Sequence, residues 1–357
     1  MSGFNLKRIG MIMEPRAGDP NEAEGVLNPA AARARDGTLY LFPRLVAKGN
    51  YSRIGIARVL FDNAGDPKGV ERIGIALEPE AEYELSDHGG GCEDPRIIWL
   101  EPLRYYVMTY TALSRHGPRI AIATSEDLFT WRRIGLASFQ PWHGLSFDGV
   151  DDKDASMFST LIPAPSGHPA IGMIHRPLFP GTRPEEKAGR HRSGRVDTDR
   201  ECIWISYCHV DANGKHEAGA FGTHHQLACP AADWERLKIG GGPPPIMCRH
   251  GWLFLYHGVH EVPRPGSAGE KLCYSAGAMV LSAKHPNHII YRSPEPVLVP
   301  EVASELLGTV DSVVFPTGID RRVDLGTPDR FDVYYGMADY RIGVARLDVP
   351  PVLPRSA

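Results

Sequence analysis

The chain has 357 residues, of which 42% are hydrophobic and 23% are charged, and its formal net charge is −4 at pH 7. These values are typical of a folded globular protein, and the balanced charge argues against nucleic-acid and anionic-membrane partners. The 31 prolines and 38 glycines are scattered along the chain, which favours many turns and short strands over long helices.

Targeting segments and metal sites are not expected either. Residues 1–8 contain no apolar run of the length that a signal peptide needs, and no later run approaches a membrane span, so we expect a cytoplasmic protein. The six cysteines include no CxxC pair, which argues against a disulfide framework or a zinc site. His224 and His225 would point to opposite faces of a strand, so we expect no metal there.

A pair of short strands returns five times along the chain. The first strand of each pair is aromatic-rich, and the second is rich in small and β-branched residues. The expected pairs are 37–42 with 53–57, 104–110 with 119–123, 170–175 with 202–206, 251–257 with 275–279, and 331–336 with 341–345. Corresponding positions in successive second strands lie between 66 and 83 residues apart. This repetition, without helical periodicity, predicts an all-β fold: one five-bladed β-propeller over residues 1–357, with long loops. A β-sandwich followed by a second β domain is the alternative.

Residues 89–97, between the first and second pairs, carry the densest functional pattern: three glycines followed by Cys92-Glu93-Asp94-Pro95-Arg96. The glycines let the backbone bend or a ligand approach, and Pro95 restricts the residue before it. The hydrophobic run 97–100 would hold Asp94 at the mouth of a sheet, where a general acid belongs. The alternative is a surface loop in which Glu93 and Arg96 merely form an ion pair.

Other acids and bases are expected to meet Asp94 because the inner strands of a propeller converge on a central funnel. Lys153 with Asp154, Asp311 and Asp339 each lie near the start or end of an expected strand in a different blade. The charged segment at about 180–200 interrupts the third blade as an inserted loop, which we interpret as a solvated excursion; a lid and an oligomer contact are the alternatives.

Residues 91–97 resemble the signature of glycoside hydrolase family 130, the β-mannoside phosphorylases. The likeness continues in chain order through 28–30, 51–54, 153–158, 175–177, 256–258, 313–318 and 335–339. The resemblance implies a five-bladed propeller that cleaves a β-mannosidic bond with inorganic phosphate, inverts the anomeric centre and releases α-mannose 1-phosphate. It also implies that Asp94 is the general acid, whose proton reaches the glycosidic oxygen through a hydroxyl of the bound mannose. No cofactor is implied beyond phosphate as co-substrate.

Phosphorolysis needs a basic cradle in place of a second carboxylate, because phosphate arrives already ionised and nucleophilic. The candidate phosphate ligands are Arg53, Arg119, Lys153, His175 and Arg176. The resemblance supports Arg53, Lys153 and His175 best. Each has a structural alternative: the arginines could be solvated at strand starts, Lys153 could lie in an acidic surface loop, and His175 could be a satisfied core histidine.

Sugar hydroxyls are good partners for carboxylates, and aromatic faces stack on sugar rings. We therefore predict sugar binding by Asp311, Asp339 and Tyr256, and interpret Trp252 as a core residue rather than a stacking platform.

Two other functions stay open. One is a hydrolase on the same scaffold, with Glu217 or Asp152 activating water; the other is a non-catalytic propeller that binds glycans or proteins. Cys92, Ser159 and Ser312 depart from the family pattern and leave the leaving sugar open. The linkage (β-1,2 or β-1,4), the chain length accepted and a homo-oligomeric state are not fixed by the sequence.

Overall fold

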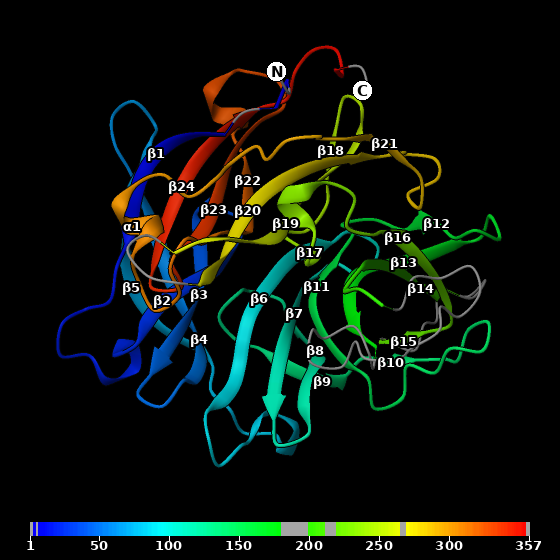
Figure 1. The fold of residues 1–357 in the computed structure, drawn as a ribbon, viewed down its shortest axis with the longest axis horizontal. Coiled ribbons are helices and arrows are strands. Elements are labelled where there is room, and N and C mark those ends of the chain that lie inside the picture. The colour runs from blue at the N-terminus through cyan, green and yellow to red at the C-terminus, as the bar shows by residue number, and fades with distance from the viewer. Residues whose placement is uncertain (1–2, 5, 180–198, 211–218, 265–268, 355–357) are drawn as a thin grey trace.

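The computed structural model describes residues 3–4, 6–179, 199–210, 219–264 and 269–354. Within them the regular secondary structure is almost entirely strand (Figure 1), so the predicted all-β class is confirmed. The described helical elements are short: α1 (Ala303–Leu306) and the 3-10 turns η1 (Pro20–Glu22), η2 (Glu82–Glu84), η4 (Asp233–Glu235) and η5 (Val323–Leu325). None of the helices in these ranges is long and apolar enough to cross a membrane. The insert predicted at 180–200 lies outside the described residues except for its last two positions, and Glu217 lies outside them entirely.

We group the strands into five antiparallel units, each named here by its place in the chain; units one and two belong to one eight-stranded sheet, joined by a short parallel pairing at Tyr51↔Gly90 and Ser52↔Gly91. Unit one contains β2 (Gly25–Arg33), β3 (Leu39–Ala47), β4 (Tyr51–Phe61) and β5 (Pro67–Leu77). Unit two contains β6 (Gly90–Leu100), β7 (Tyr105–Ser114), β8 (Gly117–Ser125) and β9 (Arg132–Leu136). Unit three contains β11 (Asp151–Met157), β13 (Pro169–Leu178), β14 (Ile203–His209) and β16 (Thr223–Ala228).

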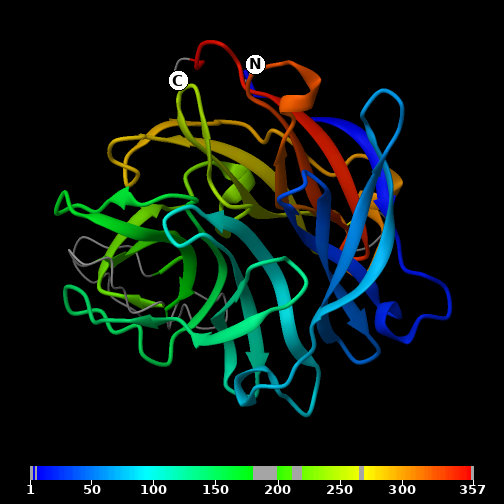
Figure 2. The same cartoon turned by 180° about the vertical axis from the view of Figure 1, so that it is seen from behind.

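Unit four contains β17 (Lys238–Gly241), β18 (Ile246–Cys248), β19 (Gly251–Pro263), β20 (Glu270–Leu281) and β21 (Ile289–Arg292). Unit five contains β22 (Val314–Arg321), β23 (Arg330–Met337), β24 (Arg341–Asp348) and the N-terminal strand β1 (Leu6–Met13). Both views show β1 beside β24 (Figure 1, Figure 2), and the two strands pair from Leu6↔Leu347 onward. The minor strands are β10 (Ser138–Phe139), β12 (Ile162–Pro163) and β15 (Ala220–Phe221).

The five strand pairs predicted from the sequence are all present, as the two middle strands of each unit. The first strand of each unit, which we call the inner strand, is a different element: β2, β6, β11, β17 with β18, and β22. The inner strand of unit four is divided in two because prolines 243–245 have no amide to donate to the ladder. The predicted site residues Asp94 and Lys153 lie on these inner strands, in β6 and β11.

Apolar side chains pack between consecutive units all the way round. One cluster joins Phe42 and Ile54 of unit one to Met108 of unit two, and the next joins unit two to Met157 and Met173 of unit three. Further clusters join unit three to unit four and unit four to unit five. A fifth cluster returns from unit five to unit one. Each unit therefore packs apolar side chains against two other units.

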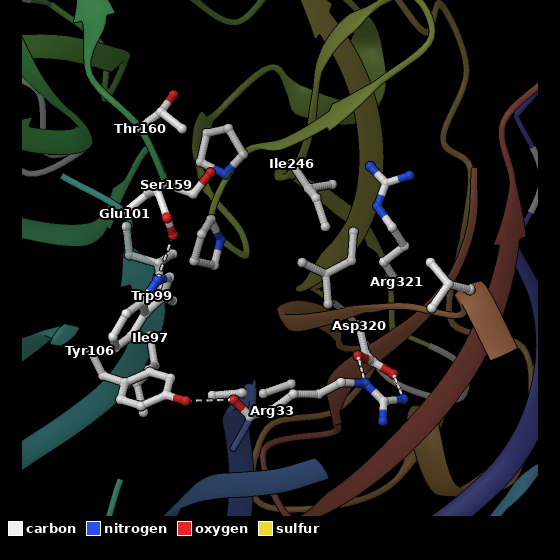
Figure 3. Close-up of a pocket in the computed structure, with 17 residues that line it drawn as sticks. Arg33, Ile97, Trp99, Glu101, Tyr106, Ser159, Thr160, Ile246, Asp320 and Arg321 are labelled. Carbon is white, nitrogen blue, oxygen red and sulfur yellow. Dashed lines mark hydrogen bonds and ion pairs between the residues drawn. The ribbon is translucent and has the colours of Figure 1, made fainter. Parts of the chain in front are cut away.

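The inner strands end around a pocket of about 570 Å³ (Figure 3). Its lining comes from all five units, at residues 31–33, 97–99, 159–160, 244–246 and 319–321. These residues come after Asn28, Asp94 and Asp154 along the chain. The pocket therefore lies toward the C-terminal ends of the inner strands.

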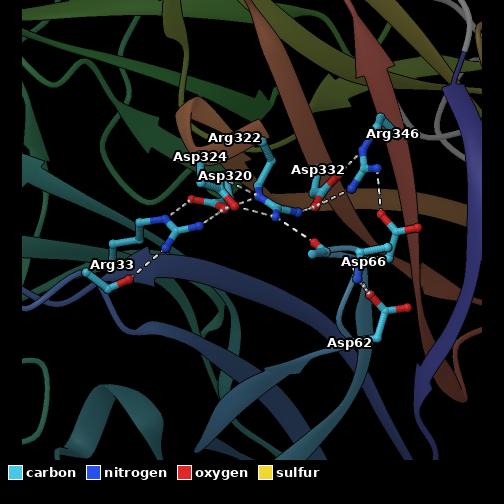
Figure 4. Close-up of polar contacts among 11 residues, drawn as sticks. Arg33, Asp62, Asp66, Asp320, Arg322, Asp324, Asp332 and Arg346 are labelled. Atoms are coloured by element: carbon cyan, nitrogen blue, oxygen red, sulfur yellow. Dashed lines mark hydrogen bonds and ion pairs between the residues drawn. The ribbon is translucent and has the colours of Figure 1, made fainter. Parts of the chain in front are cut away.

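Buried ion pairs fasten unit five to unit one (Figure 4). Arg33 donates through Nε and Nη2 to the two oxygens of Asp320, at 2.7 Å each. Arg322 pairs with the fully buried Asp332 and donates to the carbonyl oxygen of Gly65 at 2.6 Å. Arg346 donates through Nε to Asp332 Oδ1 at 2.9 Å. Asp332 therefore stands between two arginines and compensates both.

Asp332→Asn should destabilise the protein by about 3 kcal/mol, because it takes the fully buried carboxylate from both Arg322, which keeps only the half-exposed Asp324, and Arg346. Urea unfolding at pH 7 measures the change. The control is Asp348→Asn, which removes a half-exposed partner of Arg330 and should cost less than about 1 kcal/mol. Equal losses in the two variants would contradict a structural role for the buried pair.

Candidate active site

Three inner strands bulge at the same relative place, and a short polar residue occupies each bulge. Asn28, Asp94 and Asp154 have φ of 45°, 46° and 58°. The strand register shifts at each of them, between Leu27 and Ala30 for the first and at the matching positions of β6 and β11. Asn and Asp tolerate this left-handed conformation better than most residues, and a bulge redirects a side chain. A left-handed bulge therefore orients one polar side chain on each of these three inner strands.

The glycines before Asp94 are needed for close packing of strands. Gly90 and Gly91 have φ of 92° and 113° and pair in parallel with Tyr51 and Ser52 of β4. A Cβ atom on Gly91 would lie 2.2 Å from the Ser52 carbonyl oxygen. Only glycine satisfies both the backbone angle and this distance. The glycine run thus lets β6 join β4 and fixes the start of the strand that carries Asp94.

Asp94 is buried among cations. Asn28 Nδ2 donates to Asp94 Oδ1 at 2.9 Å, and Arg44 Nη1 lies 3.4 Å from the same oxygen. Burial opposes ionisation, but the charges of Arg44, Arg96 and Lys153 outweigh it and hold the pKa of Asp94 below its usual range. Without a bound anion, the carboxyl group is therefore ionised at neutral pH.

Arg44 is fixed by its own contacts. Its Nη2 donates to Glu93 Oε1 at 2.6 Å, and its Nε donates to Ser52 Oγ at 2.9 Å. Glu93 is buried, so this pair places one cation and one anion directly beside Asp94. Arg44 was not identified from the sequence, because nothing in 39–47 marks it apart from an ordinary strand arginine.

Asp339 is the second carboxylate of the centre. It follows β23 in a turn in which Ala338 and Asp339 both have φ of 48°. Burial first, and then the negative charge of Asp94, raise the pKa of Asp339 to about 6. The two carboxyl groups therefore favour opposite protonation states, with Asp94 ionised and Asp339 able to keep a proton in mildly acidic solution.

A second group of charges surrounds Asp154. Arg176 Nε donates to Asp154 Oδ2 at 2.6 Å, and Arg176 also pairs with Glu201. Arg96 Nη2 lies 4.0 Å from Asp154 Oδ1, and His257 Nε2 lies 3.9 Å from Asp154 Oδ2. A Cβ atom on Gly240 would lie 2.2 Å from Asp154 Oδ2, so only glycine leaves room for this contact.

Several donors in this group have no partner. Within the described ranges, Arg96 Nη2 and both ring nitrogens of His257 are buried without a hydrogen bond. Burial lowers the pKa of His257 to about 3, so the ring is neutral. Burial, with a smaller contribution from Arg176, lowers the pKa of Lys238 to about 8, and its Nζ lies 5.7 Å from the centre of the Tyr274 ring. A neutral imidazole carries one N–H, so the unpaired donors here are Arg96 Nη2 and one nitrogen of His257. Unpaired buried donors cost free energy, and a bound anion would satisfy them.

Lys153, Arg176 and Asp339 are the sequence-predicted residues that act on the same centre as Asp94. The charge of Lys153 lowers the pKa of Asp94, and Lys153 also lowers the pKa of Asp339. Burial raises the pKa of Tyr274, on which the charges of Arg176, Asp339 and Lys153 also act. The ammonium group of Lys153 has no ion pair with any residue that the structure describes.

Arg53 and Arg119 lie at strand starts and already have partners. Arg53 Nη1 donates to Asn21 Oδ1 at 2.6 Å, and its Nε lies 3.3 Å from Glu78 Oε1. Arg119 donates to Asp151 Oδ1 at 2.5 Å and to the Gly149 carbonyl oxygen. Their predicted contact with phosphate stays a prediction.

His175 is fully buried, and both of its ring nitrogens are engaged. Nδ1 lies 2.6 Å from Asp152 Oδ2, and Nε2 lies 2.6 Å from Ser206 Oγ. Ser206 Oγ lies in turn 2.7 Å from His224 Nδ1. The arrangement matches the alternative of a satisfied core histidine, and it gives the ring no free nitrogen for an anion.

The other two sugar-binding candidates, Tyr256 and Asp311, have contacts of their own. Tyr256 is fully buried in the cluster between units three and four, and its hydroxyl accepts from Arg292 Nε at 3.3 Å. Asp311 is exposed in the loop after α1 and accepts from the Gly308 amide at 3.4 Å. Trp252 is buried against Phe158, with ring centres 5.0 Å apart, which confirms its interpretation as a core residue.

Comparisons with known proteins fit this architecture. The model of glycoside hydrolase family 130, described as beta-1,4-mannooligosaccharide phosphorylase, matches residues 6–159 and 195–354. The chain is 28% identical over 358 residues to the 1,2-beta-oligomannan phosphorylase of Thermoanaerobacter sp. (strain X514), covering 98% of this chain and 99% of that protein.

Solved structures share the fold. The β-1,2-mannobiose phosphorylase of Listeria innocua, in complex with β-1,2-mannobiose, superposes with a TM-score of 0.68 at 20% identity, covering 96% of each chain. A second structure has a TM-score of 0.66 at 23% identity, covering 99% of this chain and 96% of that one. It represents the GH130 family of mannoside phosphorylases, which contains glycoside hydrolases that target β-1,2 mannosidic linkages in Candida mannan. The chain belongs to glycoside hydrolase family 130, the β-mannoside phosphorylase family.

Asp339→Asn should stabilise the protein at pH 8 by about 2 kcal/mol, because a carboxyl group whose pKa is raised to about 6 opposes folding once it ionises. The penalty is absent below the unfolded pKa near 4 and grows as the pH rises through about 6. Urea unfolding of both proteins at pH 4 and pH 8 measures the free energy of unfolding without and with this penalty.

The control is Asp311→Asn, an exposed carboxylate whose replacement should change stability by less than about 0.5 kcal/mol at either pH. If Asp339→Asn raised the free energy of unfolding equally at pH 4 and pH 8, ionisation of the Asp339 carboxyl group would not be the cause of the gain.

Proposed function

We propose that this member of family 130 is an inverting phosphorylase, which cleaves a β-mannosidic bond with inorganic phosphate and releases α-mannose 1-phosphate. The observation that carries the proposal is one buried acid, Asp94, beside cations and donors whose hydrogen-bonding capacity the protein leaves unused. A hydrolase needs a second carboxylate that is free to activate water, whereas a phosphorylase needs a place for an anion.

We infer a five-bladed propeller, which would bring inner strands from all parts of the chain to one axis. Two observations support it. The apolar clusters join each unit to the next and unit five to unit one. The inner strands also contact one another in order, β2 with β6, β6 with β11, β11 with β17, and β22 with β2. A single domain over the whole chain follows from the same closure.

The phosphate cradle proposed here keeps Lys153 and Arg176 and adds Arg96, Lys238 and His257. Arg96 and His257 have unpaired nitrogens, and the two lysines lack ion pairs in the described part of the chain. Arginine can hold two phosphate oxygens at once, and lysine acts as a point charge. Arg53 and Arg119 would contribute from the outer edge, and His175 would act only through Asp152, the neighbour of Lys153.

In the reaction, an oxygen of phosphate attacks the anomeric carbon while the bond from that carbon to the leaving oxygen breaks. Asp94 supplies the proton that the leaving oxygen takes up, through a hydroxyl of the bound mannose as the family resemblance implies. Attack from the face opposite the leaving group inverts the configuration. Asp339, which can keep a proton near pH 6, would hold sugar hydroxyls; Asp311 and Tyr256 stay predictions for the same task.

Phosphate would also load the proton onto Asp94. The cations that hold Asp94 ionised are the groups beside which the anion binds. A bound dianion offsets their field, so the pKa of Asp94 rises and the carboxyl group takes up the proton that the chemistry consumes. Nucleophile binding and acid protonation are then one event.

The hydrolase alternative is supported less well. The carboxylates of this region are mostly paired: Glu93 with Arg44, Asp154 with Arg176, and Asp152 with His175. Asp339 is the exception, and an assay without phosphate decides whether it activates water. Asp152 is also fully buried in its pair, where burial raises its pKa. The linkage is left to experiment, because the family description names β-1,4 bonds and the full-length relative names β-1,2 bonds. A cytoplasmic location, where phosphate is at hand, fits the reaction.

Release of mannose 1-phosphate from manno-oligosaccharides should require inorganic phosphate, and Asp94→Asn should lower its rate about 10²–10⁴-fold. The reverse reaction, with α-mannose 1-phosphate and a panel of acceptor sugars, identifies the linkage and the acceptor. Lys153→Met should raise the KM for phosphate more than it lowers kcat. Undiminished release of free mannose without phosphate would establish the hydrolase instead.

Binding of sulfate, a dianion that does not titrate between pH 5 and 8, should be accompanied by proton uptake at pH 5–6. Isothermal calorimetry in buffers of different ionisation enthalpy counts the protons. Asp94→Asn should abolish most of the proton uptake. Asp339→Asn should keep the part of the uptake that comes from protonation of Asp94. The same uptake in wild type and Asp94→Asn would contradict the coupling.

A further inference from the structure

The pocket at the far end of the inner strands is separate from the acid centre. Its lining residues follow Asn28, Asp94 and Gly242 by two to five positions along the chain. At ~3.3 Å per residue, that places them roughly 7–16 Å further along. Arg96 is fully buried between the two regions and donates through Nε to the Gly242 carbonyl oxygen at 2.9 Å. The pocket therefore opens on the opposite side from Asp94.

The size and floor of this pocket suit a small molecule with an apolar face. Its volume of about 570 Å³ lies within the range typical of ligand sites. Ile97, Ile246 and Ile319 line it together with the Trp99 ring (Figure 3). Trp99 packs edge-on against Tyr106 at 5.0 Å, and the Tyr106 hydroxyl is bound to the Arg33 carbonyl oxygen at 2.9 Å. The aromatic pair is thus held in place.

The arginines at the rim are already paired. Arg33 makes a two-point pair with Asp320, and Arg321 pairs with Asp329 at 2.9 Å. Trp99 Nε1 donates to Glu101 Oε2 at 2.6 Å. Neither lining arginine is therefore free to bind an anion, and Glu101 offers a hydrogen-bond acceptor. A neutral ligand with hydrogen-bond donors fits this rim better than an anion.

Hydrogen-bonding capacity nevertheless remains along one wall. Glu101 Oε1 and the hydroxyls of Ser159 and Thr160 make no hydrogen bond with any residue that the structure describes. A carboxylate oxygen accepts, and each hydroxyl both donates and accepts. A purely apolar ligand would cover these groups without satisfying them, which costs free energy. The occupant should carry several hydroxyl groups.

We propose that this pocket is a second, non-catalytic binding site for a neutral sugar: one pyranose ring or a short oligosaccharide. The apolar face of the ring rests on Ile97 and Trp99, and its hydroxyls meet Glu101, Ser159 and Thr160. The site would hold a glycan chain at the face opposite the acid. The inference goes beyond the proposed reaction and does not require it.

Thr160 offers the sharpest test, because it is exposed at the rim and Thr160→Arg fills the pocket without disturbing a buried contact. The full chain is titrated with D-mannose and with β-linked mannobiose, without phosphate, by calorimetry and tryptophan emission. We expect a binding event that perturbs Trp99 and that Thr160→Arg weakens at least tenfold, with phosphorolysis changed less than twofold. Ser166→Arg, a matched change at an exposed turn outside the pocket, should leave the event intact.

Trp99→Ala provides a second variant, which should abolish the same event while the acid centre still binds sugar. Binding that is unchanged in Thr160→Arg would overturn the proposal, as would a wild-type protein with no binding event beyond that of the acid centre. Occupation by an apolar dye that neither sugar displaces would overturn it too. If phosphorolysis is not observed but the Thr160-sensitive event is, the proposed reaction fails and this inference stands.

Discussion

The structure depends on a charge imbalance around one buried carboxylate. Asp94 is surrounded by Arg44, Arg96 and Lys153, and this field is strong enough to keep it ionised in spite of burial. Burying charges is costly unless each finds a partner. Here the partners are incomplete, because Arg96 Nη2 and the His257 nitrogens remain unsatisfied in the described part of the chain. The unused capacity is what makes the centre a receptor for an anion.

The rest of the fold keeps this centre in place. Left-handed bulges at Asn28, Asp94 and Asp154 direct polar side chains from three strands that are far apart in sequence. Glycines at positions where a Cβ atom would collide, such as Gly91 and Gly240, allow the strands and the Asp154–His257 contact to approach. At the periphery, arginine–aspartate pairs join unit five to unit one. Rigid outer packing therefore supports a strained and highly charged interior.

The sequence predicted the repeating strands well because their pattern is local: an aromatic strand, a turn and a strand of small residues. It identified Asp94 and Lys153 for a similar reason, since both lie in compact motifs. It did not resolve which of two neighbouring residues faces the centre. Tyr256 packs in the core while His257 lies beside Asp154, and His175 is buried while Arg176 binds Asp154. A strand alternates faces at every residue, so an uncertainty of one position reverses the assignment. Arg44, Lys238 and Tyr274 had no local signal, because only the tertiary fold brings Arg44 to Asp94 and the other two to the charges around Asp154.

The most direct measurement is a crystal structure of the protein soaked in orthophosphate. The account predicts a tetrahedral anion within hydrogen-bonding distance of Arg96 Nη2 and a His257 ring nitrogen, with the ammonium groups of Lys153 and Lys238 turned toward it. An ordered water held between Asp94 and Asp339, with no anion in the cluster at high phosphate concentration, would contradict the central claim.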